Sequence, residues 1–209
     1  NIISNKKFPV KKYNYSAWWG LIMPISVIDK YGYPFPFFIK FDDIEYGMRC
    51  LDKEILFDKD LCVRHESFKK KFSSYLEYYT IRNGMIVNCL HINHPYLKTI
   101  FRFIIKNIKH WVKGRFIEMK LANIAVIDFS KGIDFFLNVD IEENNKKIIS
   151  ISKTKINKFV NIFTRPFACI AYTIKLMFIF NKAKKDYRSR VNEVTSLEYW
   201  EKVLNINEH

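Results

Sequence analysis

The sequence predicts an α/β protein in which a first third of short strands and loops precedes a mainly helical remainder. Residues 1–72 carry short apolar runs of strand length, separated by glycine and proline residues that mark turns. From residue 73 the apolar residues recur with a helical period instead. The 209 residues are 49% hydrophobic and 17% aromatic, which is enough to build a core and argues against disorder.

Three short runs in the first region are expected to be strands. The run Phe37–Phe41 is apolar apart from one lysine and leads directly into an acidic sequence. The runs 55–57 and 61–63 follow it and predict a short edge pair. A strand ending before Asp42 would carry Asp42 and Asp43 to its end, where side chains can face a cleft.

Helix signals follow from residue 73. Ser74 and Glu77 have the spacing of a capping box and predict the start of a first helix. Pro95 opens a second, with an apolar stripe on one face, basic residues over most of the other and a stop at Gly114. A third helix is expected over 116–129, continuing after a glycine towards residue 137.

The remaining segments are less regular. Residues 140–158 are rich in Asn and Lys and predict a linker or a surface helix. Residues 159–180 are strongly apolar, but the run from Pro166 holds about 15 residues and a lysine, short of the roughly 20 residues that span a bilayer. Such a run can lie in a membrane interface, with lysines reaching the headgroups. For the apolar stripe of the second helix, a core or interface face is the alternative to a membrane face. Thr195 and Glu198 form a second capping pair for a terminal helix.

The composition points to an anionic partner. The chain carries a formal charge of +14, which favours a nucleic acid, a phosphate-bearing substrate or an acidic membrane surface. The cysteines have no paired spacing, which argues against a zinc cluster or a disulfide framework and suits a reducing compartment. They are Cys50, Cys62, Cys89 and Cys169.

The densest chemical signal is a group of three carboxylates, Asp42, Asp43 and Glu45. Adjacent like charges repel and are costly to bury. A protein therefore keeps such a group for a solvated turn, for metal binding or for proton transfer. From these residues alone the solvated turn is as good an account as a site.

Other motifs flank this acidic group in a fixed order. Trp18-Trp19-Gly20 and Gly32-Tyr33-Pro34 precede it, and the run Leu61–His65 and the pair Arg82-Asn83 follow it. In order and spacing, residues 15–90 resemble the C-terminal half of an inverting family 2 glycosyltransferase of the galactofuranosyltransferase-like branch. That branch has a paired Trp, an apolar strand into Asp-Asp-x-(Glu/Asp)-Tyr-Gly-x-Arg, a strand ending in His, and an aromatic-rich helix with Arg-Asn.

The resemblance implies a division of the chain. Residues 1–72 would be the C-terminal part of a nucleotide-sugar catalytic domain of the GT-A type, and residues 73–209 a helical C-terminal region. The Asp-x-Asp metal motif of the family would lie upstream, and no such motif precedes the acidic group in this sequence. We therefore expect the C-terminal portion of a longer enzyme, inactive by itself if the donor half is missing.

The resemblance also implies roles for the acidic group. Asp43 matches the general base that takes the proton from the acceptor hydroxyl, and Asp42 and Glu45 would orient the acceptor or Asp43. His65 matches a ligand of the divalent ion, Mn²⁺ or Mg²⁺, that neutralises the leaving diphosphate. A structural turn acid and an ordinary core or surface histidine are the alternatives. The histidines without a matching motif are expected to be structural: His91, His94 and His110.

Further residues are assigned to the substrates. Trp18 and Trp19 could stack on a sugar, with core packing as the competing account. Lys69 and Lys70 lie where a donor pyrophosphate could bind, although a solvated charge run explains them equally well. The same resemblance assigns four more residues to substrate binding: Tyr46, Arg49, Arg82 and Asn83. Arg82 could instead pair with an acid of the 42–45 group.

The sequence thus predicts an inverting glycosyltransferase, with galactofuranose as the sugar suggested by the resemblance. Its donor would be a UDP-linked sugar, and its acceptor a growing cell-envelope or capsule glycan, free or polyprenyl-linked. The protein would be cytoplasmic and peripheral to the inner face of an anionic cell membrane, with no nucleic acid involved. A basic nucleic-acid-binding module and a membrane-associated scaffold without catalysis are the rival hypotheses.

Overall fold

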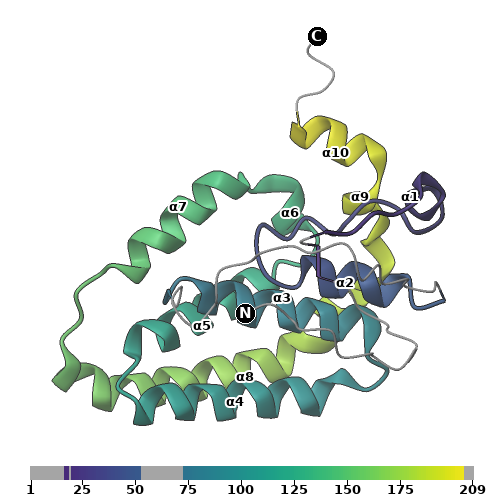
Figure 1. Ribbon diagram of the computed structural model, residues 1–209. Coiled ribbons are helices and arrows are strands. Elements are labelled where there is room, and N and C mark those ends of the chain that lie inside the picture. The colour runs from purple at the N-terminus through teal and green to yellow at the C-terminus, as the bar shows by residue number, and fades with distance from the viewer. Residues whose placement is uncertain (1–16, 19, 53–72, 205–209) are drawn as a thin grey trace, which may run out of the picture.

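A computed structural model gives the fold and describes residues 17–18, 20–52 and 73–204. These residues form ten helices and no strand (Figure 1). The α/β fold class predicted from the sequence is therefore wrong for the described part of the chain, which is all-helical. The predicted strands 55–57 and 61–63 lie outside the described residues. The division of the chain at residue 72 stays a prediction.

The run Phe37–Phe41 is a bent segment, not a strand. Its first aromatic ring packs in the core: Phe37 is buried against the preceding Phe35, with their ring centroids 4.6 Å apart. The backbone then turns through two consecutive left-handed residues, Lys40 (φ 69°) and Phe41 (φ 70°). Helix α2 (Asp42–Arg49) begins directly after them, so the acidic group lies on a helix.

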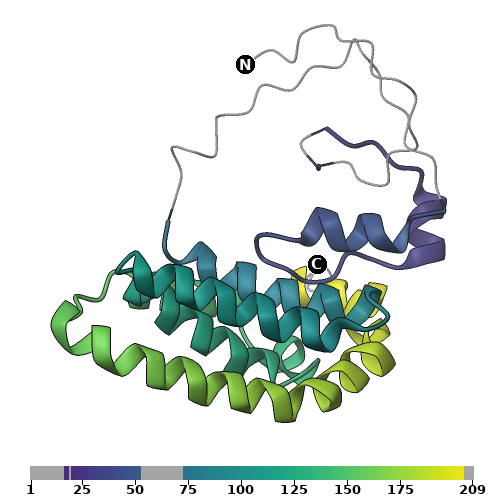
Figure 2. The same cartoon turned by 90° about the horizontal axis from the view of Figure 1, so that it is seen from below.

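The core is built around α3 (Leu76–His91) and α5 (Phe116–Phe129), which pack against each other. Both helices bury residues on all sides, as central helices of a bundle do. Helices α4 (Pro95–Val112) and α8 (Lys158–Arg190) lie side by side along one flank of this pair (Figures 1 and 2). Their contacts with α3 and α5 bury only one side of each.

Four of the predicted helices are confirmed: α3 is the first of them and α10 (Leu197–Leu204) is the terminal one. The second runs from Pro95 to Val112 and is followed by Gly114, whose φ of 63° suits glycine. The third matches α5, after which Gly132 (φ 66°) separates it from the short α6 (Asp134–Asn138). The Asn- and Lys-rich segment is largely helical as well, in α7 (Ile141–Ser152).

Both capping-box predictions are wrong, because tertiary contacts and a neighbouring serine take over. The Ser74 hydroxyl donates to Glu118 (3.0 Å) rather than capping α3. Near the C-terminal end of the described part, α9 (Asn192–Thr195) ends at the threonine that was expected to cap the next helix. Helix α10 (Leu197–Leu204) is instead capped by Ser196, whose Oγ accepts from the Tyr199 amide (3.2 Å).

Candidate active site

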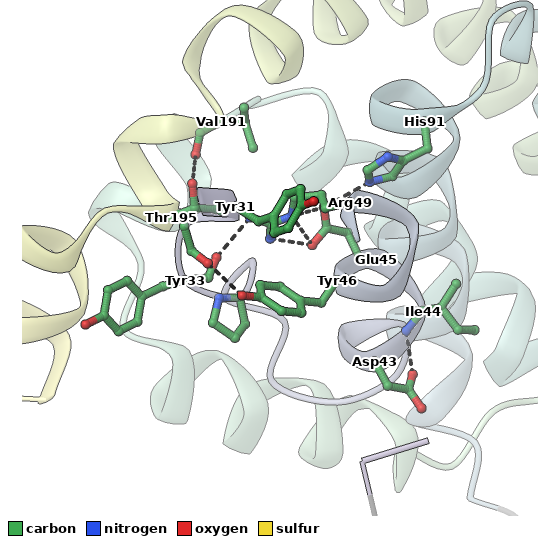
Figure 3. Close-up of polar contacts among 12 residues, drawn as sticks. Tyr31, Tyr33, Asp43, Ile44, Glu45, Tyr46, Arg49, His91, Val191 and Thr195 are labelled. Atoms are coloured by element: carbon green, nitrogen blue, oxygen red, sulfur yellow. Dashed lines mark hydrogen bonds and ion pairs between the residues drawn. The ribbon is translucent and has the colours of Figure 1, made fainter. Parts of the chain in front are cut away.

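The two aspartates of the acidic group lie on the first turn of α2. Asp42 and Asp43 are both half-buried, and Asp43 Oδ1 accepts a hydrogen bond from the Ile44 amide (2.8 Å). The amide groups of a helix N-terminus favour negative charge, so the location stabilises a carboxylate. Figure 3 shows the Asp43 carboxylate pointing away from the cluster of polar contacts around Glu45. This carboxylate is thus directed away from the polar network of its own helix.

The environment of Asp42 favours its protonated form. Partial burial raises the pKa of Asp42 above its ordinary value, and the adjacent charge of Asp43 acts in the same direction. Asp42 therefore holds a proton more readily than an ordinary aspartate.

Glu45, two positions after Asp43 on α2, has a structural environment. It is fully buried and contacts Arg49 Nε through both of its oxygens (2.9 and 3.1 Å) and Arg49 Nη2 through Oε2 (2.5 Å). His91, the last residue of α3, also contacts this carboxylate, with 3.0 Å between His91 Nε2 and Glu45 Oε1. Burial raises the pKa of Glu45, but the His91 hydrogen bond and the Arg49 charge outweigh it, and the net pKa is lowered. Glu45 is an ionised, internally paired carboxylate.

The second half of α2 fastens the loop after α1 (Ile25–Tyr31). Arg49 Nη1 donates to the carbonyls of Tyr31 and Tyr33, each at 3.0 Å, and the Tyr46 hydroxyl donates to the Gly32 carbonyl (2.9 Å). Figure 3 shows these contacts converging on one loop. The ring of Trp18 packs edge-on against Tyr46, with centroids 5.8 Å apart. Substrate binding by Tyr46 and Arg49 is untested, but in this structure their polar groups hold the backbone.

The turn that precedes Asp42 is held by α3. The fully buried Asn83 donates through Nδ2 to the carbonyls of Ile39 (3.0 Å) and Lys40 (2.9 Å). Gly84 lies under the Phe41 ring, where an added Cβ would come within 3.3 Å of it. Left-handed residues other than glycine cost energy and persist where the surroundings over-determine them. Asn83 and Gly84 supply such surroundings and so position the acidic turn.

Arg82 lies deeper in the same helix, with only 2% of its surface exposed. Four aromatic rings surround its guanidinium, with centroids between 4.8 and 5.4 Å away. It donates to the Tyr78 hydroxyl and to Asn83 Oδ1, each at 2.9 Å. The alternative in which Arg82 pairs with an acid of the 42–45 group is therefore not what the structure shows. Its predicted contact with substrate stays untested.

The structure thus brings together most of the described residues that the sequence singled out. Asp42, Asp43 and Glu45 lie on α2, and Asn83 and Arg82 lie on α3, which packs against it. His91 was expected to be an ordinary structural histidine, and its contact with Glu45 was missed. The sequence carried a signal only for the Glu45–Arg49 pair. Its i,i+4 spacing brings the two side chains together once the segment is recognised as a helix. The remaining predictions fall outside the described residues: Trp19, His65, Lys69 and Lys70.

Within the described residues, no group of three or more His, Cys, Asp or Glu side chains is arranged to hold a metal ion. A hollow of about 90 Å³ lies beside Phe41 and Gly84, and the polar residues lining it include Thr80 and Asn88. This volume is smaller than the roughly 300–1,000 Å³ of typical ligand pockets. Neither Asp42 nor Asp43 lines it. The metal dependence expected from the sequence stays a prediction.

Comparison with known proteins supports a relationship to glycosyltransferases. No protein-family model matches the chain. It is 27% identical to galactofuranosyltransferase GlfT2 of Mycolicibacterium smegmatis over 123 residues, which are 57% of this chain and 19% of that protein. It is 26% identical to galactofuranosyltransferase GlfT2 of Mycobacterium tuberculosis over 133 residues, 60% of this chain and 21% of that protein. The matched region spans about a fifth of each relative, and the chain is glycosyltransferase-like over that region.

Proposed function

We propose that this chain is the acceptor-side and catalytic-base portion of an inverting, nucleotide-sugar-dependent glycosyltransferase. The donor would carry galactofuranose on UDP, and the acceptor would be a cell-envelope or capsule glycan, free or polyprenyl-linked. The observation that supports this most is the similarity to two galactofuranosyltransferases. The placement of Asp43 on the first turn of α2, directed away from the paired Glu45, adds a carboxylate suited to the chemistry.

Asp43 would act as the general base. The acceptor hydroxyl gives its proton to the Asp43 carboxylate while its oxygen forms a bond to the anomeric carbon of the donor sugar. The bond between that carbon and the nucleoside diphosphate breaks, and its electron pair leaves with the diphosphate. Because the attack comes from the face opposite the leaving group, the configuration at the anomeric carbon inverts. Asp42 would hydrogen-bond a neighbouring acceptor hydroxyl.

The other assignments belong to the same proposal. Trp18, whose ring is partly exposed beside Tyr46, would offer its face to the sugar together with Trp19. His65 would help to hold a Mn²⁺ or Mg²⁺ ion, which neutralises charge on the departing diphosphate when bound. Lys69 and Lys70 would contact the donor phosphates.

The test is an assay of the full-length protein against a panel of UDP-sugars, including UDP-galactofuranose, with and without a glycan acceptor and with and without Mn²⁺. We expect UDP release that depends on the acceptor and on the ion and that is fastest with UDP-galactofuranose. Release from another UDP-sugar alone would contradict the donor assignment. Release from none of them, together with salt-dependent binding to DNA or RNA, would contradict the enzyme and favour the nucleic-acid-binding alternative.

A further inference from the structure

Helices α4 and α8 together present a large apolar surface. Along α4, Phe101, Ile105 and Ile108 are between 50% and 59% exposed. Along α8, Phe163, Phe167 and Phe178 are 60%, 74% and 83% exposed. Figures 1 and 2 both show the two helices side by side on one flank of the bundle. We name the exposed side of this helix pair the α4–α8 face.

A hydrogen bond and core packing hold α4 and α8 in place. Trp111 Nε1 on α4 donates to the carbonyl of Ile162 on α8 (2.9 Å). The opposite side of α8 buries Leu176, Phe180 and Tyr187 in the core. The exposed aromatic residues therefore do not turn inward without breaking this packing. Contiguous apolar surfaces of this extent mark interaction sites.

The charge on these helices has one sign. Neither α4 nor residues 158–185 of α8 contain an Asp or Glu. Exposed cations accompany the apolar residues on both helices: Lys98, Arg102 and Lys109 on α4, and Lys175, Lys182 and Lys185 on α8. The α4–α8 face is therefore apolar and purely cationic.

This combination selects among possible occupants. A second copy of the chain placed on the same face would bring cations against cations, which costs energy. Lysine is also depleted in protein–protein interfaces. An anionic bilayer satisfies both features, since aromatic and aliphatic side chains enter the acyl boundary and lysines reach the phosphates of the headgroups.

The geometry favours helices that lie along the bilayer. Helix α8 is long and apolar enough to cross a membrane by length and composition, with 17% of its apolar window buried in the protein. However, it also packs against α3, α4 and α5, and a transmembrane course would remove those contacts. An orientation parallel to the surface keeps the bundle intact and immerses only the exposed side.

We infer that the α4–α8 face docks in the plane of an anionic lipid bilayer. This inference does not depend on the proposed transferase activity. Helix α2 packs on α3, and both views show α3 between α2 and α8 (Figures 1 and 2). Docking through the α4–α8 face therefore leaves the acidic turn a helix layer away from the lipid, where a glycan chain can reach it.

Flotation of the full-length protein with vesicles tests the inference. We expect binding to phosphatidylcholine vesicles that contain phosphatidylglycerol, and weaker binding to phosphatidylcholine alone. The double variant Phe167→Ser/Phe178→Ser should bind at least 10-fold more weakly. The matched control Ile22→Ser/Leu204→Ser removes side chains that are 88% and 58% exposed but lie off this face, and it should bind like the wild type. All four positions are exposed, so the fold should be retained.

A second set of variants isolates the contribution of charge. Lys98→Gln, Arg102→Gln and Lys109→Gln should each lower binding to anionic vesicles about 5-fold. Lys146→Gln and Lys147→Gln, on the exposed side of α7, should leave it unchanged.

Three results would overturn the inference. The first is that the wild type does not bind vesicles. The second is that face and control variants bind equally well. The third is a concentration-dependent dimer, detected by sedimentation, that the double variant abolishes in the absence of any vesicle binding. UDP release measured on soluble substrates should not respond to these variants, so the failure of docking and the failure of the transferase are distinguishable.

Discussion

The three carboxylates on the first turn of α2 lie in two different environments. On the first turn, Asp42 and Asp43 are half-buried, and the Asp43 carboxylate points away from the interior contacts. Glu45, two positions after Asp43, is completely buried and is bound by Arg49 and His91. The two aspartates keep part of their surface exposed, whereas Glu45 binds the arginine that fastens the loop after α1. Burial and pairing, rather than residue type, therefore distinguish the candidate site residues from the structural one.

The largest effect on stability should come from Glu45→Ala. It leaves the Arg49 guanidinium and the His91 ring without their buried acceptor, and losing one partner of such a pair costs about 3 kcal/mol in the free energy of unfolding. Urea unfolding followed by circular dichroism measures this. The matched control is Asp52→Ala, which removes a carboxylate paired with Lys30 in an exposed salt bridge of the same region and should change the stability little. Equal losses of unfolding free energy in the two variants would mean that the burial of Glu45 does not increase its contribution to stability.

Asn83→Ala should have a smaller effect on stability and a separate effect on the site. It removes the two hydrogen bonds to the left-handed turn and leaves Arg82 Nε unsatisfied, at a cost of about 1–3 kcal/mol. In the full-length enzyme we expect kcat to fall while donor binding is retained, because the turn before Asp42 loses its support.

Asn88→Ala is the control for that variant. Asn88 is buried on the same helix, but its amide donates to Thr99 on α4 (3.0 Å). This change should lower the stability without a matching fall in kcat. If Asn88→Ala lowers kcat as much as Asn83→Ala, the positioning role of Asn83 is lost and only a general effect on folding remains.

The smallest effect is a pH dependence of the Glu45 contribution. The pKa of Glu45 is lowered in the folded state, so its contribution to stability is complete above the pKa of an unfolded glutamate, about 4.3. It disappears as the pH falls through the lower folded value. The stability difference between the wild type and Glu45→Gln should therefore shrink as the pH falls below about 4. A difference that grows on acidification would show that Glu45 is protonated in the folded protein.

The helices that could be predicted are those with strong local signals. Pro95 and Gly114 delimit α4 through backbone preferences that need no tertiary partner, and the apolar period between them is helical. The predicted strand at 37–41 failed for a non-local reason. An apolar run of this length does not distinguish a strand from a segment whose rings fill separate gaps between helices. Its left-handed end is stabilised by Asn83, more than 40 residues away.

The candidate site was predictable in part. The density of carboxylates indicated the location of Asp42 and Asp43, but it did not separate them from Glu45. That separation depends on the helical conformation of α2 and on His91, which is 46 positions distant in the sequence. Burial of a charged residue is decided by such partners, and no local pattern reveals them.

The most direct test of the division within α2 is the Asp43→Asn variant of the full-length protein, measured for transfer, donor binding and unfolding. We expect acceptor-dependent UDP release to fall by about 10²- to 10⁴-fold, the usual contribution of a general base. Donor affinity and the free energy of unfolding should stay near those of the wild type. Unchanged turnover, or a loss of activity matched by a loss of stability, would contradict the assignment of Asp43 as the base.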